Sequence, residues 1–184
     1  MVVERLQSGD AAALDPLYRR HRGAVYRFAV LWTGSAQIAA DVTQDVFMHL
    51  LTRASEYHAD RGALLAWLLG VARNFCRQRT VTARDTVPID DDDGLPELTL
   101  ATPDTAVDAL IGREDLDRLR RAIASLPPHY RDVLVLIELS ERSYAEAALI
   151  CGCQLNTVRS RLSRARALLA GWLDATSSSS TGTT

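Results

Sequence analysis

One segment limits the possible folds of this chain more than any other: residues 143–166, SYAEAALICGCQLNTVRSRLSRAR. Ser143, with Glu146 three residues later, is typical of a capping box, in which each residue's side chain binds the other's backbone N–H at the start of a helix. Gly152 readily adopts the left-handed conformation that ends a helix and turns the chain. The segment therefore predicts two helices joined by a tight turn, a helix-turn-helix.

The second helix of this segment has one apolar stripe and one polar, basic face. The stripe recurs at i, i+4, i+7 and i+11 and consists of Val158, Leu162, Ala165 and Leu169. The side of this helix opposite the stripe could be an ordinary solvent-exposed face. Such a face normally mixes acids with its arginines, whereas this one has no acid. We therefore predict DNA contacts from side chains that suit phosphates and base edges, namely Asn156, Thr157, Arg159, Ser160, Ser163 and Arg164.

Charge is strongly segregated along the 184 residues, although the net charge is only −2. Residues 1–84 carry 11 arginines and 7 acids, and residues 118–184 carry 9 arginines and 5 acids. Between them, residues 85–117 carry 1 arginine and 11 acids. Because a polyanion attracts basic segments, we expect both ends of the chain, but not its middle, to approach nucleic acid.

Apolar side chains follow helical spacing over most of the remaining sequence. The pattern predicts helices over residues 10–32 with Asp10 as N-cap, about 36–53 after Gly34, and from Leu64 onward after a loop at 56–63. A further helical pattern spans about 105–124, and after the break at Pro127 a helix resumes through residues 133–137. The chain is therefore predicted to be all-α.

Composition divides the chain into two helical domains. The first covers 1–84 and the second covers 113–173, where the helix-turn-helix closes the domain. Residues 85–112 include four consecutive aspartates and three prolines without a sustained period, so we expect a flexible acidic linker. Residues 174–184 are rich in Ser and Thr and are expected to form a disordered tail.

Two further surfaces of the first domain are candidate binding sites. One predicted helix face combines an apolar centre with a polar rim, which is typical of a protein contact, and consists of Asp41, Gln44, Asp45 and Met48. On the next helix, basic and amide side chains suit a phosphate backbone and exposed base edges, and Arg61 in the preceding loop could line a pocket for an unstacked base. This second set consists of Arg61, Arg73, Asn74, Arg77 and Gln78. The alternative for both surfaces is ordinary solvent exposure.

Other functions are disfavoured by what the sequence lacks. It has no glycine-rich phosphate loop, nucleophile elbow or His-x-x-x-His pair, so we do not expect an enzyme. Cys76, Cys151 and Cys153 lie in apolar surroundings that favour packing over metal ligation, and we expect neither a metal nor a cofactor. Without an apolar run of roughly 18 residues or a secretory signal, we expect a cytoplasmic protein with no membrane insertion of its own.

Four blocks in a fixed order resemble a known family: AADVTQDVFMHLL, AWLLGVARNFCRQR, SLPPHYRDVLVL and NTVRSRLSRAR. Together they resemble an extracytoplasmic-function sigma factor of the bacterial sigma-70 family, whose members in this group have only regions two and four. The resemblance covers about 10–84 and 114–172. It implies an alternative sigma factor that binds core RNA polymerase, recognises promoter DNA and initiates transcription under the control of an anti-sigma factor.

The resemblance also implies a role for each surface. Asp41, Gln44 and Asp45 would contact the clamp of the polymerase's largest subunit. Asn74 and its basic neighbours would bind the minus-ten element and hold a flipped base, which offsets a few kcal/mol of unstacking. The minus-thirty-five element would meet Arg159, Ser160, Ser163 and Arg164 in the major groove.

Three positions depart from the family pattern. Ala40 stands where a second acid commonly precedes the clamp-helix aspartate, which implies a weaker or shifted polymerase contact. Leu149 replaces a usual polar residue and is expected to be exposed as a contact for a regulator. Gln154 is a poor N-cap, so the start of the second helix is uncertain by a residue or two.

Two other functions fit parts of the sequence. A stand-alone helix-turn-helix repressor or activator would use residues 1–84 for sensing or dimerisation and would bind duplex operators alone. An RNA-binding regulator would use Asn74 and its basic neighbours on single strands without promoter preference, but the basic helix-turn-helix argues against it.

Overall fold

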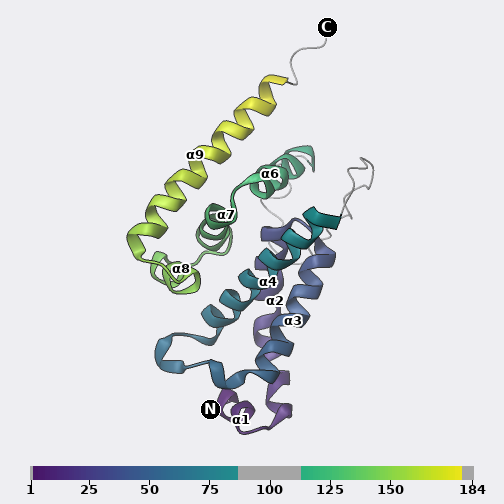
Figure 1. The fold of residues 1–184 in the computed structure, drawn as a ribbon, viewed down its shortest axis with the longest axis vertical. Helices are drawn as coiled ribbons and strands as arrows, with labels where there is room; N and C mark the ends of the chain where they lie inside the picture. Colours follow the sequence, from purple (N-terminus) through teal and green to yellow (C-terminus); the bar gives the residue numbers. More distant parts are fainter. Residues whose placement is uncertain (1, 87–112, 180–184) are drawn as a thin grey trace.

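The computed structural model describes residues 2–86 and 113–179, and the regular elements in these ranges are all helical (Figure 1), which confirms the predicted all-α class. The first domain contains α1 (Val2–Gln7), η1 (Ala11–Ala13), α2 (Leu14–Thr33), α3 (Ala36–Thr52), η2 (Ala54–Glu56), η3 (Ala59–Arg61) and α4 (Leu64–Thr86). The second contains α6 (Arg113–Ser125), α7 (Pro128–Leu134), a π-helical turn η4 (Val135–Leu139), α8 (Tyr144–Cys151) and α9 (Leu155–Ser179).

Helices α2, α3 and α4 form a bundle in the first domain (Figure 1). The Asp10 side chain accepts a hydrogen bond from the Ala12 N–H at 3.1 Å, and this cap begins the helical segment that leads into α2. The Ser35 side chain caps α3 by accepting from the Ile38 N–H. The bundle closes over apolar side chains that are less than 2% exposed, among them Phe28, Val42, Val46, Leu50 and Leu68.

The helix-turn-helix forms as the sequence predicts. Ser143 and Glu146 make both hydrogen bonds of the capping box at the start of α8, and Gly152 ends the helix with φ of 63°. In α9, Val158 and Leu162 are buried against the rest of the second domain, while the opposite face is solvent-exposed. The apolar stripe therefore fixes which side of α9 faces solvent.

The C-terminal boundary differs from the prediction. Helix α9 continues to Ser179, so residues 174–179, which we expected to be disordered, are helical. The reason is that an established helix gains one hydrogen bond for each added residue without forming a new nucleus. Helix α1 was not predicted either, and α4 extends two residues beyond the expected boundary at 84. The predicted acidic linker, apart from its first two residues, and residues 180–184 lie outside the described residues.

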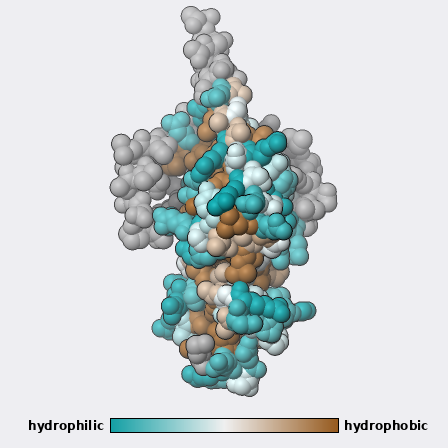
Figure 2. Space-filling model, turned by 90° about the vertical axis from the view of Figure 1, so that its left-hand side faces the viewer, coloured by the Kyte–Doolittle hydropathy of each residue, from teal (hydrophilic) through white to brown (hydrophobic). Residues whose placement is uncertain are grey.

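The two domains pack against each other, which no sequence pattern predicted. Helix α8 contacts α4, and η4 contacts α2. Between the domains, the indole Nε1–H of Trp32 donates to Asp132 Oδ1 at 2.9 Å, and the Arg131 guanidinium stacks over the Trp32 ring with its carbon 4.5 Å from the ring centroid. Seen from the side on which α8 and α9 lie, apolar surface separates hydrophilic upper and lower parts of the molecule (Figure 2).

Candidate nucleic-acid and polymerase interfaces

The outer face of α9 presents the predicted DNA-binding side chains. Thr157 is half-buried, and the others are exposed: Asn156, Arg159, Ser160, Ser163 and Arg164. The four arginines of this helix are not equivalent, because Arg161 is half-buried and Arg166 pairs with Glu138. This distinction depends on neighbouring helices and was not visible in the sequence.

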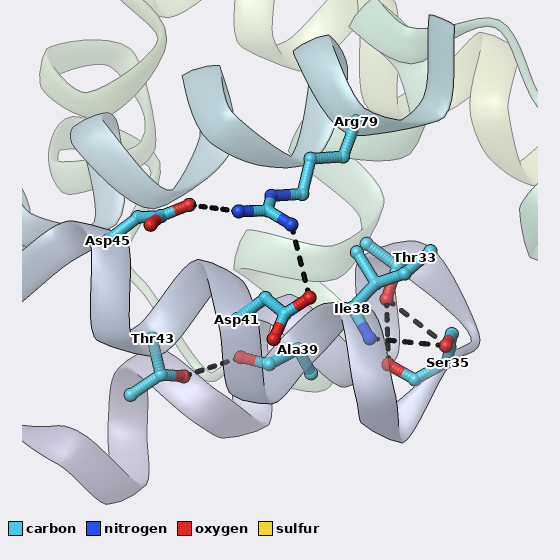
Figure 3. Close-up of polar contacts among 8 residues, drawn as sticks. All are labelled: Thr33, Ser35, Ile38, Ala39, Asp41, Thr43, Asp45 and Arg79. Atoms are coloured by element: carbon cyan, nitrogen blue, oxygen red, sulfur yellow. Dashed lines mark hydrogen bonds and ion pairs between the residues drawn. The ribbon is translucent and has the colours of Figure 1, made fainter. Parts of the chain in front are cut away.

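The predicted polymerase-binding face lies on α3, next to the C-terminal half of α4 (Figure 3). Gln44 is exposed, and Met48 retains 50% of its accessible surface. Asp41 and Asp45 both face Arg79 of α4, whose Nη1 donates to Asp41 at 3.1 Å and whose Nη2 pairs with Asp45 (Figure 3). The carboxylates are therefore held in place by an arginine that sequence reasoning did not assign to this site.

A groove of about 650 Å³ borders this face. It is lined by apolar and aromatic side chains of α2 and α3, including Tyr18, Phe47 and Met48, and by the exposed Ala40. An apolar groove beside carboxylates and an amide has the chemistry of a protein-binding surface, with an apolar centre and a polar rim.

The predicted minus-ten residues on α4 divide into two groups. Asn74 and Gln78 are exposed, as is Arg61 in the preceding loop. Arg73 and Arg77 instead turn toward the second domain, where both pair with the Asp132 carboxylate and Arg73 Nε lies 2.9 Å from Asp132 Oδ2. Sequence spacing placed these residues on one helix side but did not reveal that two of them are already paired.

A cavity of about 480 Å³ adjoins Asn74. Its walls in the first domain include Tyr57, Arg61 and Trp67, and the Tyr57 hydroxyl donates to the Gly62 carbonyl at 3.1 Å, which orders the loop. Its remaining wall comes from α8 of the second domain, through Leu149 and Ile150. Aromatic and basic side chains around a cavity of this size suit a stacked nucleobase.

Three buried residues at the domain boundary were missed by sequence analysis: Trp32, Arg131 and Asp132. They are 1%, 2% and 1% exposed. The one available signal was that two charged residues, Arg131 and Asp132, directly precede the apolar run 133–137. Charged side chains are rarely buried unless they are paired and hydrogen-bonded. This signal indicated burial but not the partner.

The interface also changes the chemistry of a nearby thiol. Burial raises the pKa of Cys151 to about 12, and the negative charge of Asp132 contributes in the same direction. All three cysteines are free thiols. Within residues 2–86 and 113–179, no cluster of His, Cys, Asp and Glu is arranged to hold a metal ion, and no helix there is long and apolar enough to cross a membrane.

These features define a two-domain helical protein with a DNA-binding helix-turn-helix. The sequence matches the profile of Sigma-70 region 2 over residues 17–85 and that of Sigma-70 region 4 over residues 116–169. The probable RNA polymerase sigma-C factor of Mycobacterium bovis is 33% identical over 167 residues, which cover 88% of this chain and 84% of that protein. The ECF RNA polymerase sigma factor SigE of Mycolicibacterium smegmatis is 31% identical, and the match covers 90% of this chain but only 65% of that protein.

Solved structures agree with these matches. One of them is the co-crystal structure of the sigma factor RpoE with the anti-sigma factor NepR from Bartonella quintana. RpoE is 28% identical to this chain, and the match covers 86% of this chain and 95% of the RpoE chain with a TM-score of 0.63. This chain belongs to the extracytoplasmic-function group of the sigma-70 family. Sigma factors are non-enzymatic transcription initiation factors.

Proposed function

We propose that this sigma factor binds core polymerase through α3 and contacts promoter DNA through α4 and α9. The observation that supports this most is the outer face of α9, where predicted DNA-contacting side chains are exposed on a helix whose other side is buried. On this proposal the chain itself catalyses no reaction and acts in the cytoplasm, where the polymerase works.

The polymerase contact is assigned to Asp41, Gln44, Asp45 and Met48. Changing Gln44 and Asp45 together to Ala should abolish co-purification with core polymerase, because it removes two polar groups from the rim of an apolar contact. Changing Asp60 to Ala is the control, since it is an exposed acid of η3 and not of α3. Normal core binding by the Gln44/Asp45 variant, with unchanged helical content, would place the clamp contact elsewhere.

The minus-ten contact is assigned to Arg61, Arg73, Asn74, Arg77 and Gln78. If Asn74 helps to hold a flipped base, Asn74→Ala should impair transcription from duplex promoters far more than from templates already mismatched over the melted segment. Unstacking and unpairing the bases of a duplex costs a few kcal/mol, which capture of the flipped base offsets. A template that is already open does not have this cost.

The control for this experiment is Asn156→Ala on α9, which should lower transcription equally from both templates because the upstream element is duplex in each. Permanganate footprinting of exposed thymines follows the opening directly. Equal defects of Asn74→Ala on both templates would assign Asn74 to folding or general phosphate binding.

We also propose that an anti-sigma factor holds this chain inactive. The support is the likeness to RpoE of Bartonella quintana, whose structure was solved with an anti-sigma factor. Run-off transcription with purified core polymerase, with and without a co-expressed candidate protein, tests this control. A stand-alone repressor would instead dimerise and bind duplex operators without polymerase, which sedimentation and DNA binding of the free chain distinguish.

A further inference from the structure

The last residue of α1 reaches the loop that lines the cavity beside Asn74. The side-chain amide of Gln7 donates to the carbonyl of Ala54 at 3.0 Å and to the carbonyl of Tyr57 at 3.1 Å. These carbonyls belong to the first residue and the C-cap of η2, and the Tyr57 N–H closes this turn by donating to Ala54 at 3.2 Å. Because a primary amide carries two N–H donors, one Gln7 side chain can bind both carbonyls at once and hold the turn.

Gln7 can support this loop because α1 is itself anchored to the bundle. The neighbouring Leu6 is buried in the apolar core together with Ala54 of η2. The Arg5 guanidinium pairs with Asp10 at 2.6 Å across the turn that leads from α1 into η1. A helix as short as α1 is marginal in water unless tertiary packing holds it, and these contacts fix the end from which Gln7 extends.

Tyr57 connects this support to the cavity. Its ring forms part of the cavity wall and lies edge-on to Trp67, with 6.1 Å between the ring centroids. Its hydroxyl donates to the Gly62 carbonyl at 3.1 Å. Tyr57 is therefore held at both ends, at its backbone carbonyl by Gln7 and at its hydroxyl by the backbone of the loop. A ring on which a base stacks must keep a fixed plane, and packing and hydrogen bonds of this kind fix it.

We propose that Gln7 is a positioning residue of minus-ten recognition: acting through Tyr57, it sets the shape of the cavity that receives the flipped base. The inference rests on the proposed capture of a base beside Asn74. Without the two hydrogen bonds the loop samples other arrangements, and the cost of ordering it falls on the step in which the base binds. Base capture should therefore weaken, whereas the polymerase face on α3 and the outer face of α9, which lie on other helices, should keep their affinities.

The test uses the full chain with core polymerase and compares a duplex promoter with a template already mismatched over the melted segment. Gln7→Glu keeps the length of the side chain but replaces the N–H donors with acceptors, and Gln7→Ala removes the amide. Both variants should fold, since Gln7 is exposed. We expect opening of the duplex promoter to slow by roughly three- to tenfold, the factor that corresponds to the net contribution of a typical hydrogen bond. Transcription from the pre-opened template should change less.

Amide hydrogen exchange of the free chain measures the loop itself, without polymerase or DNA. In both Gln7 variants, exchange should become faster over residues 54–62 and stay unchanged in α3 and α9, because the lost hydrogen bonds hold this loop alone. Ser8→Ala is the matched control, since the exposed Ser8 hydroxyl donates to the Arg5 carbonyl, within the turn that follows α1. It should change neither the exchange of the loop nor the opening of the promoter.

Asn74→Ala, measured in parallel, separates this inference from the proposed function. A duplex-specific defect in Asn74→Ala with natural opening in both Gln7 variants would overturn the role of Gln7 and leave base capture standing. Natural opening in all three variants would overturn base capture at this cavity and the inference with it. Equal defects of the Gln7 variants on both templates, or a defect without faster exchange over residues 54–62, would also overturn the inference, because Gln7 would then act on folding or directly on DNA.

Discussion

Arg164 and Arg166 lie two residues apart on α9 but differ in what they contact. Arg166 pairs with Glu138, whereas Arg164 is exposed and has no ion pair within the described residues. Arg164→Ala is therefore expected to cost roughly 1–3 kcal/mol of discrimination between a promoter and its single-base variants at the upstream element. Arg166→Ala is the matched control and should change discrimination less.

Fluorescence anisotropy with duplexes that differ at one base pair measures this discrimination. Equal weakening on every duplex would limit Arg164 to a phosphate contact, and unchanged affinity throughout would remove it from the interface. The experiment is run at one fixed salt concentration, because affinity for the phosphate backbone falls steeply with salt.

At the scale of an element, the start of α8 depends on one carboxylate. The Glu146 carboxylate accepts the Ser143 N–H at 2.9 Å and the Ser143 hydroxyl at 2.8 Å, and these bonds lower the pKa of Glu146 below its ordinary value of 4.5. Because the folded-state pKa is lowered, the stabilisation is fully present above pH 4.5 and is lost as the pH falls through the folded-state value. Glu146→Gln should thus lower stability by about 0.5–1 kcal/mol near pH 7, and this difference should shrink in acid.

Urea unfolding followed by far-ultraviolet circular dichroism at several pH values measures this difference. Asp60→Asn, at an exposed position of η3, is the control for removing a single acid. A loss of stability that stays the same from pH 7 to pH 3 would show that the charge of Glu146 does not hold the cap.

At the scale of the whole molecule, Cys151 reports whether the two domains are in contact. Because the thiolate is the reactive form, a pKa raised to about 12 should make alkylation of Cys151 near pH 8 at least about tenfold slower than that of an ordinary thiol. Opening of the domains exposes the thiol and separates it from Asp132, so Asp132→Asn and Leu149→Ala should both speed its alkylation.

Peptide mapping by mass spectrometry after a timed iodoacetamide pulse measures each cysteine separately. Asp117→Asn should leave the rate at Cys151 unchanged, since Asp117 is not among the charges that shift the pKa of this thiol. If Cys151 of the natural chain reacts as fast as in the unfolded protein, the thiol is not buried and the closed arrangement does not persist in solution.

The longer helices, the caps at Asp10 and Ser143, and the outer face of α9 followed from the sequence alone. These features depend on groups within a few residues of one another, as in the capping box of Ser143 and Glu146, or on the apolar stripe of a single helix. Helix ends were less predictable, because extension of α9 to Ser179 adds hydrogen bonds without a sequence signal.

Only the tertiary structure decided which candidate residues are paired. Asp132 lies 55 residues from Arg77 and 100 from Trp32, and Asp45 lies 34 residues from Arg79. No periodicity along the chain relates such positions, because their pairing depends on how separate helices pack. The sequence thus determined the faces that this sigma factor can present, and the packing of its two domains determined which of those faces are covered.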